Sequence, residues 1–218
     1  MKKIIITAVV VILIAAAVVT AVLFSDRDSG KTEADSRETT VALSESDLTV
    51  DGWLKITKIF EYDGKLAVIA ENISDTDVEY ALLTVKTKEN SFSFDASVLL
   101  HGEKVLLVCN EPSGFNPEEI YTGWKTENVL DFAETPVMHD DKYEVRVTDG
   151  SISVKNISGE DISSDIYIYY KEKADGYLNG NITRRVRIAG LKAGSQTYVN
   201  ATGINENNCQ IMFTEYDS

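Results

Sequence analysis

The residues that could carry catalysis or bind a metal are few in this chain of 218 residues. It contains two histidines, His101 and His139, so a zinc site of two histidines and a carboxylate would have to use both. The chain has no His-Glu-x-x-His or Cys-x-x-Cys spacing and no glycine-rich phosphate loop. It also lacks a serine in the Gly-x-Ser-x-Gly setting. The sequence therefore predicts a non-enzymatic protein with no catalytic residue, no cofactor and no metal centre.

Two short acidic groups, Asp75 with Asp77 and Glu160 with Asp161, offer the oxygen ligands that a calcium ion prefers. Both groups lie in segments rich in Asn, Ser and Asp, whose side chains hydrogen-bond the local backbone and close turns. The full Asp-x-Asp-x-Asp-Gly spacing of a calcium loop is missing. We therefore interpret both groups as parts of turns.

These two turns belong to one motif that the chain contains twice. Residues 72–78 read Asn-Ile-Ser-Asp-Thr-Asp-Val, and residues 156–162 read Asn-Ile-Ser-Gly-Glu-Asp-Ile. Each copy follows an alternating apolar run that begins after Asp-Gly, which is a hairpin signal. A later match, between residues 100–102 and 191–194, is offset by about eight further positions, so we expect an insertion in the loop 174–181. The pattern indicates two copies of one β-rich unit.

The sequence after residue 47 predicts an all-β fold. Short alternating apolar runs separated by turn residues fill this region, and no stretch has a sustained period of 3.6 residues. The three prolines all lie between residues 111 and 142 and mark a connection. We expect a first antiparallel sandwich at 48–133, a joint at 134–141 and a second sandwich at 142–218.

The first 24 residues predict a membrane anchor with a short cytoplasmic N-terminus. The segment from Ile4 to Phe24 is uncharged and, as a helix, is about as long as the hydrocarbon core is thick. Lys2 and Lys3 precede it, which favours an N-terminus on the cytoplasmic side. A cleaved signal peptide is the alternative, but the apolar run continues past the small residues at 15–17. Residues 25–47 are mostly polar and acidic and are expected to form a disordered tether.

A row of tyrosines offers a possible partner surface. In the strand expected at 166–170, Tyr167 and Tyr169 point outward if the residues between and beside them point inward. The inserted loop next to this strand carries Tyr177. Exposed tyrosines can stack on sugar rings or anchor a protein partner, but these three could equally cover the edge of the core. Both interpretations remain open at this point.

Charge and cysteine content narrow the classes of partner. The net charge of −14 argues against nucleic acid as a partner, because binding it requires a basic surface. Cys109 and Cys209 both lie on strand-like runs, so we expect two buried, small hydrophobic residues. A disulfide, which an exported protein could form, is the alternative.

The second unit resembles the bacterial immunoglobulin-like modules of the FxLYD and CARDB type. The resemblance rests on residues 154–158 (Val-Lys-Asn-Ile-Ser), on the aromatic pair at 169–170 and on the Leu-x-x-Gly at 191–194. The first unit departs from the pattern, with Val-Lys at 85–86 in place of the aromatic pair. The whole chain is similar to membrane-anchored surface proteins of Gram-positive bacteria that carry two such modules. The resemblance implies non-catalytic interaction or spacer domains and no site residues.

These observations predict a single-pass membrane protein with two immunoglobulin-like sandwiches outside the cell. We expect it to act as a binding or adhesion module of the cell envelope, by surface contact with a protein or glycan. The alternative is a structural or accessory subunit that spaces a cell-envelope assembly.

Overall fold

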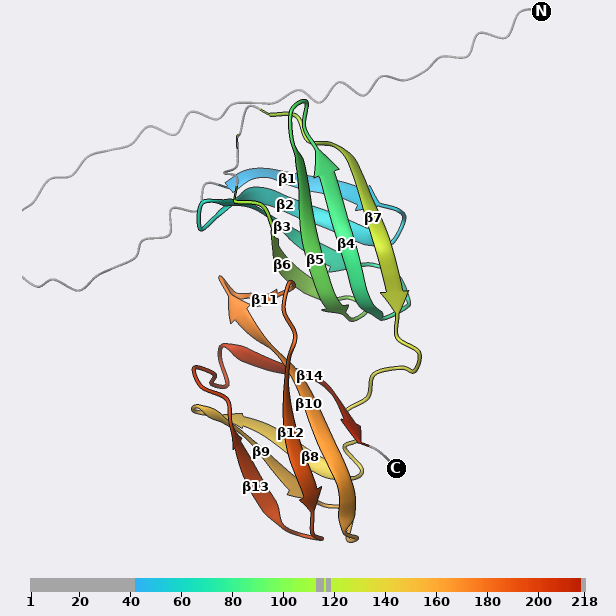
Figure 1. Ribbon diagram of the computed structural model, residues 1–218, viewed down its shortest axis with the longest axis vertical. Coiled ribbons are helices and arrows are strands. Elements are labelled where there is room, and N and C mark those ends of the chain that lie inside the picture. Colours follow the sequence, from blue (N-terminus) through green and yellow to red (C-terminus); the bar gives the residue numbers. More distant parts are fainter. Residues whose placement is uncertain (1–41, 113–115, 117–118, 217–218) are drawn as a thin grey trace, which may run out of the picture. The chain divides into compact units, whose positions relative to one another are not determined.

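The computed structural model describes residues 42–112, 116 and 119–216, with side chains from residue 47 onward (Figure 1). All of these residues belong to one compact unit. Every regular element within them is a β-strand, so the prediction of an all-β fold is confirmed. No helix in this part of the chain is long and apolar enough to span a membrane. The expected anchor, residues 1–24, and most of the expected tether lie outside the described residues.

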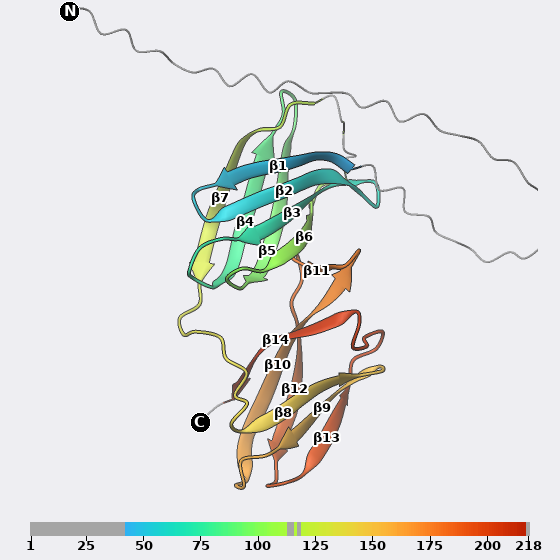
Figure 2. The ribbon, with the colours of Figure 1, turned by 180° about the vertical axis from the view of Figure 1, so that it is seen from behind.

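The N-terminal lobe consists of two antiparallel sheets that pack face to face (Figures 1 and 2). One sheet has the order β1-β2-β3-β6 and the other the order β5-β4-β7. Their bounds are β1 Ala42–Val50, β2 Leu54–Tyr62, β3 Lys65–Asn72, β4 Val78–Lys86, β5 Ser91–Leu99, β6 Lys104–Val108 and β7 Thr122–Asp131. The alternating Phe92, Phe94 and Ala96 of β5 are buried between the sheets, as period-2 packing requires.

Strand β3 is buried on both of its faces. Leu66 and Val68 belong to the core between the two sheets. Ala67 and Ile69 point the other way and form a separate cluster, against which Tyr177 of the C-terminal lobe packs. The C-terminal lobe therefore covers part of the outer face of this sheet.

The C-terminal lobe has its own core, formed between the small sheet β13-β9-β8 and the strands around β10. Strand β10 is flanked by β12 and β14, both antiparallel to it. The bounds are β8 Tyr143–Thr148, β9 Ser151–Asn156, β10 Ile162–Ala174, β11 Tyr177–Asn179, β12 Arg184–Leu191, β13 Gln196–Asn200 and β14 Cys209–Tyr216.

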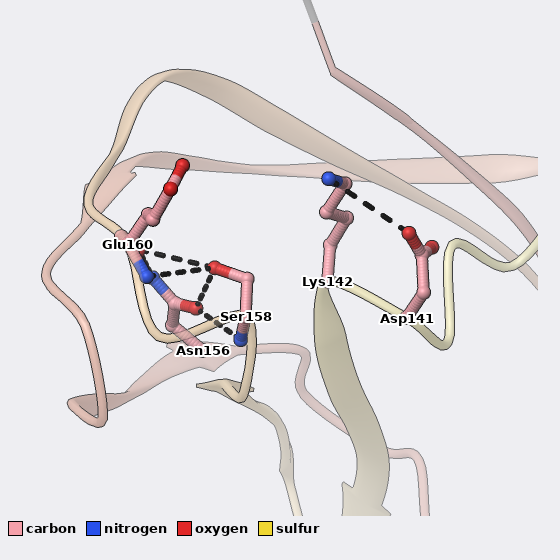
Figure 3. A network of polar contacts seen from close by, with 5 residues as sticks. All are labelled: Asp141, Lys142, Asn156, Ser158 and Glu160. Carbon is pink, nitrogen blue, oxygen red and sulfur yellow. Dashed lines mark hydrogen bonds and ion pairs between the residues drawn. The ribbon is translucent and has the colours of Figure 1, made fainter.

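The two Asn-Ile-Ser turns are built alike. The fully buried amide of Asn72 donates to the carbonyl oxygens of Thr76 and Leu99, at 2.8 Å each. Its oxygen accepts from the N–H (3.0 Å) and hydroxyl (2.7 Å) of Ser74. Asn156 makes the matching four bonds in the second turn, at 2.7 to 2.9 Å. Figure 3 shows the bonds that join Asn156 to Ser158 and Glu160.

The lobes are joined by backbone pairing. Strand β11 lies parallel to β6, with Leu178 opposite Val105 and Asn179 opposite Leu106. One sheet thus runs from the N-terminal lobe into the C-terminal lobe in the order β1-β2-β3-β6-β11-β10-β12, with β14 also paired to β10. The sequence did not predict this pairing.

Two expected loop segments are strands instead. Residues 42–47, expected as the end of the disordered tether, belong to β1, which pairs with β2 through backbone hydrogen bonds that need no apolar side chains. The expected loop 174–181 contains β11, which follows β10 through a tight turn at Asp175 and Gly176. Because both partners of the β6–β11 pairing lie far apart in the chain, local sequence patterns did not reveal it.

Candidate functional site

A groove of about 550 Å³ lies between the two lobes. It is lined by residues of β4 and β5, by the chain just after β7, and by residues of β10 and β14. Volumes of this order are typical of sites that take small molecules or single side chains. The groove is therefore the candidate functional site.

Aromatic rings form one continuous wall of the groove. The ring of Tyr169 stacks on that of Phe213, with centroids 4.3 Å apart and planes 10° from parallel. The ring of Phe132 meets Phe213 edge-on at 5.3 Å. The Tyr169 hydroxyl donates to the Glu215 carboxylate at 2.8 Å. Because the Tyr169 ring is partly desolvated, its pKa is raised.

Strand β4 contributes Tyr80 to the groove, and the Tyr80 hydroxyl donates to the Asp95 carboxylate at 2.6 Å. This hydrogen bond raises the pKa of Tyr80, because it stabilises the protonated phenol. Val98 lies next to it with a positive φ of 53°, a conformation that is uncommon for a β-branched residue. Two tyrosine hydroxyls, each tied to a carboxylate, thus border the groove.

The charged side chains of the lining are all acidic. Glu79, Glu134 and Glu215 contribute to it, and no lysine, arginine or histidine is present among the described lining residues. All three glutamates are exposed. The groove therefore presents negative charge beside aromatic surface.

A bridging segment, residues 177–183, holds the lobes together at the edge of this groove. The Ser97 N–H of β5 donates to the Gly180 carbonyl, and the Gly180 N–H donates to the Leu106 carbonyl of β6, both at 2.8 Å. The segment thus contacts the edge strands of both N-terminal sheets. Gly180 has no room for a side chain, since a Cβ atom would lie 2.5 Å from Leu107 and 2.7 Å from Val105.

The Asn181 side chain bonds the edge of β6 in the way that a neighbouring strand would. Its side-chain oxygen accepts the Val108 N–H at 2.9 Å, and its amide donates to the Val108 carbonyl at 2.9 Å. The same amide donates to the Asp95 carbonyl of β5 at 3.1 Å. One side chain therefore satisfies backbone groups on both sheets of the N-terminal lobe.

A buried lysine lies at the same junction. Lys171 of β10 is completely buried and donates to the carbonyl oxygens of Ser97 (2.6 Å) and Asn179 (3.1 Å). Burial lowers the pKa of Lys171 to about 8, although the negative charge of Glu103 opposes this shift. Burial likewise raises the pKa of Glu103 to about 7. The junction thus contains two ionisable groups, one from each lobe, whose charged forms are disfavoured.

The three tyrosines predicted as a partner surface have different environments. Tyr169 lines the groove, whereas Tyr177 packs on the cluster at the outer face of β3. Tyr167 lies under the Arg185 guanidinium, whose central carbon is 4.8 Å from the ring centroid. The inward residues of the same strand, Ile166 and Ile168, are buried as expected. Of the predicted surface, Tyr169 alone lines the groove.

One aspartate side chain in each of the two turns accepts a hydrogen bond from the backbone. An Asp77 carboxylate oxygen accepts the His101 N–H, and an Asp161 carboxylate oxygen accepts the Ala193 N–H, both at 2.8 Å. These bonds fix each turn to a later hairpin, which agrees with their interpretation as turn residues. Among the described residues no group of three or more His, Cys, Asp or Glu side chains could hold a metal ion.

The histidines and cysteines are separated in the fold. The exposed His101 contacts the Ser74 carbonyl, while the ring of His139 packs edge-on against Tyr216 at 4.8 Å. Cys109 and Cys209 are buried, as expected, in the cores of different lobes, and both thiols are free. Burial raises the pKa of the Cys109 thiol, and that of Cys209 to about 11.

The sequence did not single out the groove glutamates, Lys171 or Asn181. The glutamates come from three separate parts of the chain, and nothing in their local sequence distinguishes them from other surface carboxylates. The insertion at 174–181 was the one signal that pointed to the junction. In the comparisons with known proteins, no family model, curated protein or solved structure matches this chain.

Proposed function

We propose that this chain is a non-catalytic binding module of the cell envelope that acts by surface contact through the groove between its lobes. The observation that carries the proposal is the lining of that groove, where aromatic rings and carboxylates from both lobes converge. Aromatic side chains at the centre of a recessed surface are typical of residues that anchor a partner. The apolar segment at residues 4–24 supports attachment to a membrane, with the lobes on the outer side.

We further propose that the lobes are two immunoglobulin-like sandwiches, at 48–133 and 142–218, joined at 134–141. The matching hydrogen bonds of Asn72 and Asn156 support an origin in one repeated unit. The amides bind Leu99 and Leu191, so the extra eight positions fall between β9 and β13, in the region that contains β11. The resemblance of the second unit to FxLYD and CARDB modules is consistent with a contact function.

The test is capture of partners by the full-length chain, purified in a mild detergent and immobilised. Cell-envelope extract and a glycan panel are passed over the wild type and over the variant E79K/E134K, which reverses two charges in the groove. E206K, on an exposed turn of the C-terminal lobe, is the matched control. We expect a ligand that the wild type and E206K retain and E79K/E134K loses. Equal retention by all three would refute binding through the groove.

The second candidate function is a structural or accessory subunit that spaces an envelope assembly. The continuous sheet and the bridging segment favour it, because they fix one lobe against the other. For this function, E79K/E134K would leave assembly intact, whereas N181D would impair it by placing a carboxylate oxygen against the Val108 and Asp95 carbonyls. Copurification of envelope proteins with each variant distinguishes the two candidates.

A further inference from the structure

We propose that the groove binds an arginine or lysine side chain carried by a segment of a partner protein. This inference rests on the proposed function and specifies the chemistry of its ligand. Three features support it: the sign of the charge, the aromatic wall and the way in which the neighbouring strand edge is already occupied.

Charge in the groove differs from charge in other hollows of the described surface. A hollow of about 400 Å³ beside the second turn combines Lys142 with Glu160 and Asp161. Another, of about 460 Å³ along β12 and β13, contains Arg187 and Lys192 and no carboxylate among its described lining residues. The described lining residues of the groove between the lobes include carboxylates and no base, although Arg185 reaches its rim and donates to the Tyr169 hydroxyl at 3.5 Å. The negative charge of the groove is therefore not a uniform property of an acidic chain.

Glu79 and Glu134 are available for a ligand. Within the described part of the chain neither carboxylate takes part in an ion pair or a hydrogen bond, whereas Glu215 already accepts the Tyr169 hydroxyl. An arginine side chain offers donors in a planar fork that suits such carboxylates. A lysine side chain carries the same positive charge as arginine, concentrated on one ammonium group.

The chain already places one cation, the Arg185 guanidinium, near the aromatic wall of the groove. The Arg185 guanidinium lies over the ring of Tyr167 and within 5.9 Å of the centroid of Tyr169. A cation near an aromatic face is attracted by the negative charge density of the ring face. A second cation that enters the groove would meet Phe132 and Tyr80 with the glutamates beside them.

Recognition through backbone pairing is disfavoured at this edge. The Ser97 N–H already bonds the Gly180 carbonyl, and the Ser97 carbonyl already accepts Lys171 and the Thr183 hydroxyl. A peptide that added itself as a strand at Ser97 would have to displace the bridging segment. The groove is therefore suited to a side chain that enters it.

The experiment is an NMR titration of the isotope-labelled full-length chain in a non-ionic detergent. The probe is a capped ten-residue Gly-Ser peptide with three arginines, compared with peptides carrying citrulline or glutamate instead. We expect the arginine peptide to shift amide resonances around Val98, Phe132 and Glu134, and the citrulline peptide to bind several-fold more weakly. The position of the shifted resonances is part of the test, because an acidic protein attracts cationic peptides to its whole surface.

Matched variants test the role of the carboxylates. Replacing both unpaired glutamates, in E79Q/E134Q, should weaken binding of the arginine peptide about two- to thirtyfold, the range expected for the loss of two exposed ion pairs. The control E206Q should bind like the wild type. Equal binding of arginine and citrulline peptides, equal loss in both variants, or shifts confined to other surfaces would overturn the inference.

The two proposals fail in different ways. If a neutral glycan or a quaternary amine without a peptide is what shifts the groove resonances, the groove binds but the ligand class is wrong. If E79K/E134K captures the same partners as wild type and no probe shifts groove resonances, binding through the groove is itself refuted.

Discussion

Lys171 provides the sharpest test of the junction between the lobes. Its ammonium group is fully buried, and its pKa is lowered from 10.5 to about 8 by burial. Between these two pH values the unfolded chain holds a proton that the native state releases, so stability should rise as pH increases from 8 to 10.5. At about 1.36 kcal/mol per pKa unit, the full effect is about 3 kcal/mol. This gain in stability is present above pH 10.5 and is lost as the pH falls to 8, where buried Lys171 becomes protonated.

The perturbation is K171M, which keeps an unbranched side chain and removes the charge. We expect the difference in unfolding free energy between the wild type and K171M to move by about 3 kcal/mol in favour of the wild type between pH 8 and 10.5. Urea unfolding of the full-length chain at several pH values measures this difference. The control is K173M, on the same strand at an exposed position, which should show no such trend.

A difference between the wild type and K171M that stays constant over this range would contradict the lowered pKa of Lys171. A constant difference would mean that the ammonium group remains solvated in the native state. Glu103 has the opposite sign: its pKa is raised to about 7, so its contribution is present below pH 4.5 and lost as pH rises through 7. The E103Q variant should therefore gain stability relative to wild type between pH 4.5 and 7.

Four further substitutions test the bridging segment and the turns. G180A should destabilise the chain by about 1–3 kcal/mol in urea unfolding, because its Cβ would overlap packed side chains of β6; unchanged stability would contradict the close approach. N181A should cost about 1–3 kcal/mol and speed hydrogen exchange of the Val108 amide, since that N–H loses its acceptor; undiminished protection would speak against the contact. N72A and N156A should each cost about 1–3 kcal/mol or more, with faster exchange first in the lobe that carries the change; a loss in one lobe alone for both variants would disprove their equivalence.

Local sequence patterns predicted the parts of the fold that depend on neighbouring residues. The alternation of Phe92 and Phe94 predicted a half-buried strand, and the apolar setting of Cys109 and Cys209 predicted burial. The Asn-Ile-Ser turns were predicted because Asn, Ser and Asp side chains close turns through bonds to nearby backbone, as Asn72 and Asn156 do. Each of these features follows from side chains within a few residues of one another.

The junction and the groove could not be predicted in this way. Lys171 follows an apolar strand, and lysine at such a position usually marks the return to solvent. Its burial depends on the Ser97 carbonyl, 74 positions earlier in the chain. The contacts of Asn181 with Val108 span 73 positions, and those with Asp95 span 86. Such pairings follow from tertiary packing, which single-sequence patterns do not encode.

The bridging segment also has a consequence for how the chain is made. Synthesis proceeds from the N-terminus, so β5 and β6 emerge well before the residues that bond their edges. Until residues 177–183 follow, Ser97 and Val108 present unpaired backbone groups of the kind that recruit foreign strands. The bridging segment of the C-terminal lobe therefore covers strand edges of the N-terminal lobe and protects them from foreign strands. Chains truncated before residue 177 should aggregate more than the full-length chain.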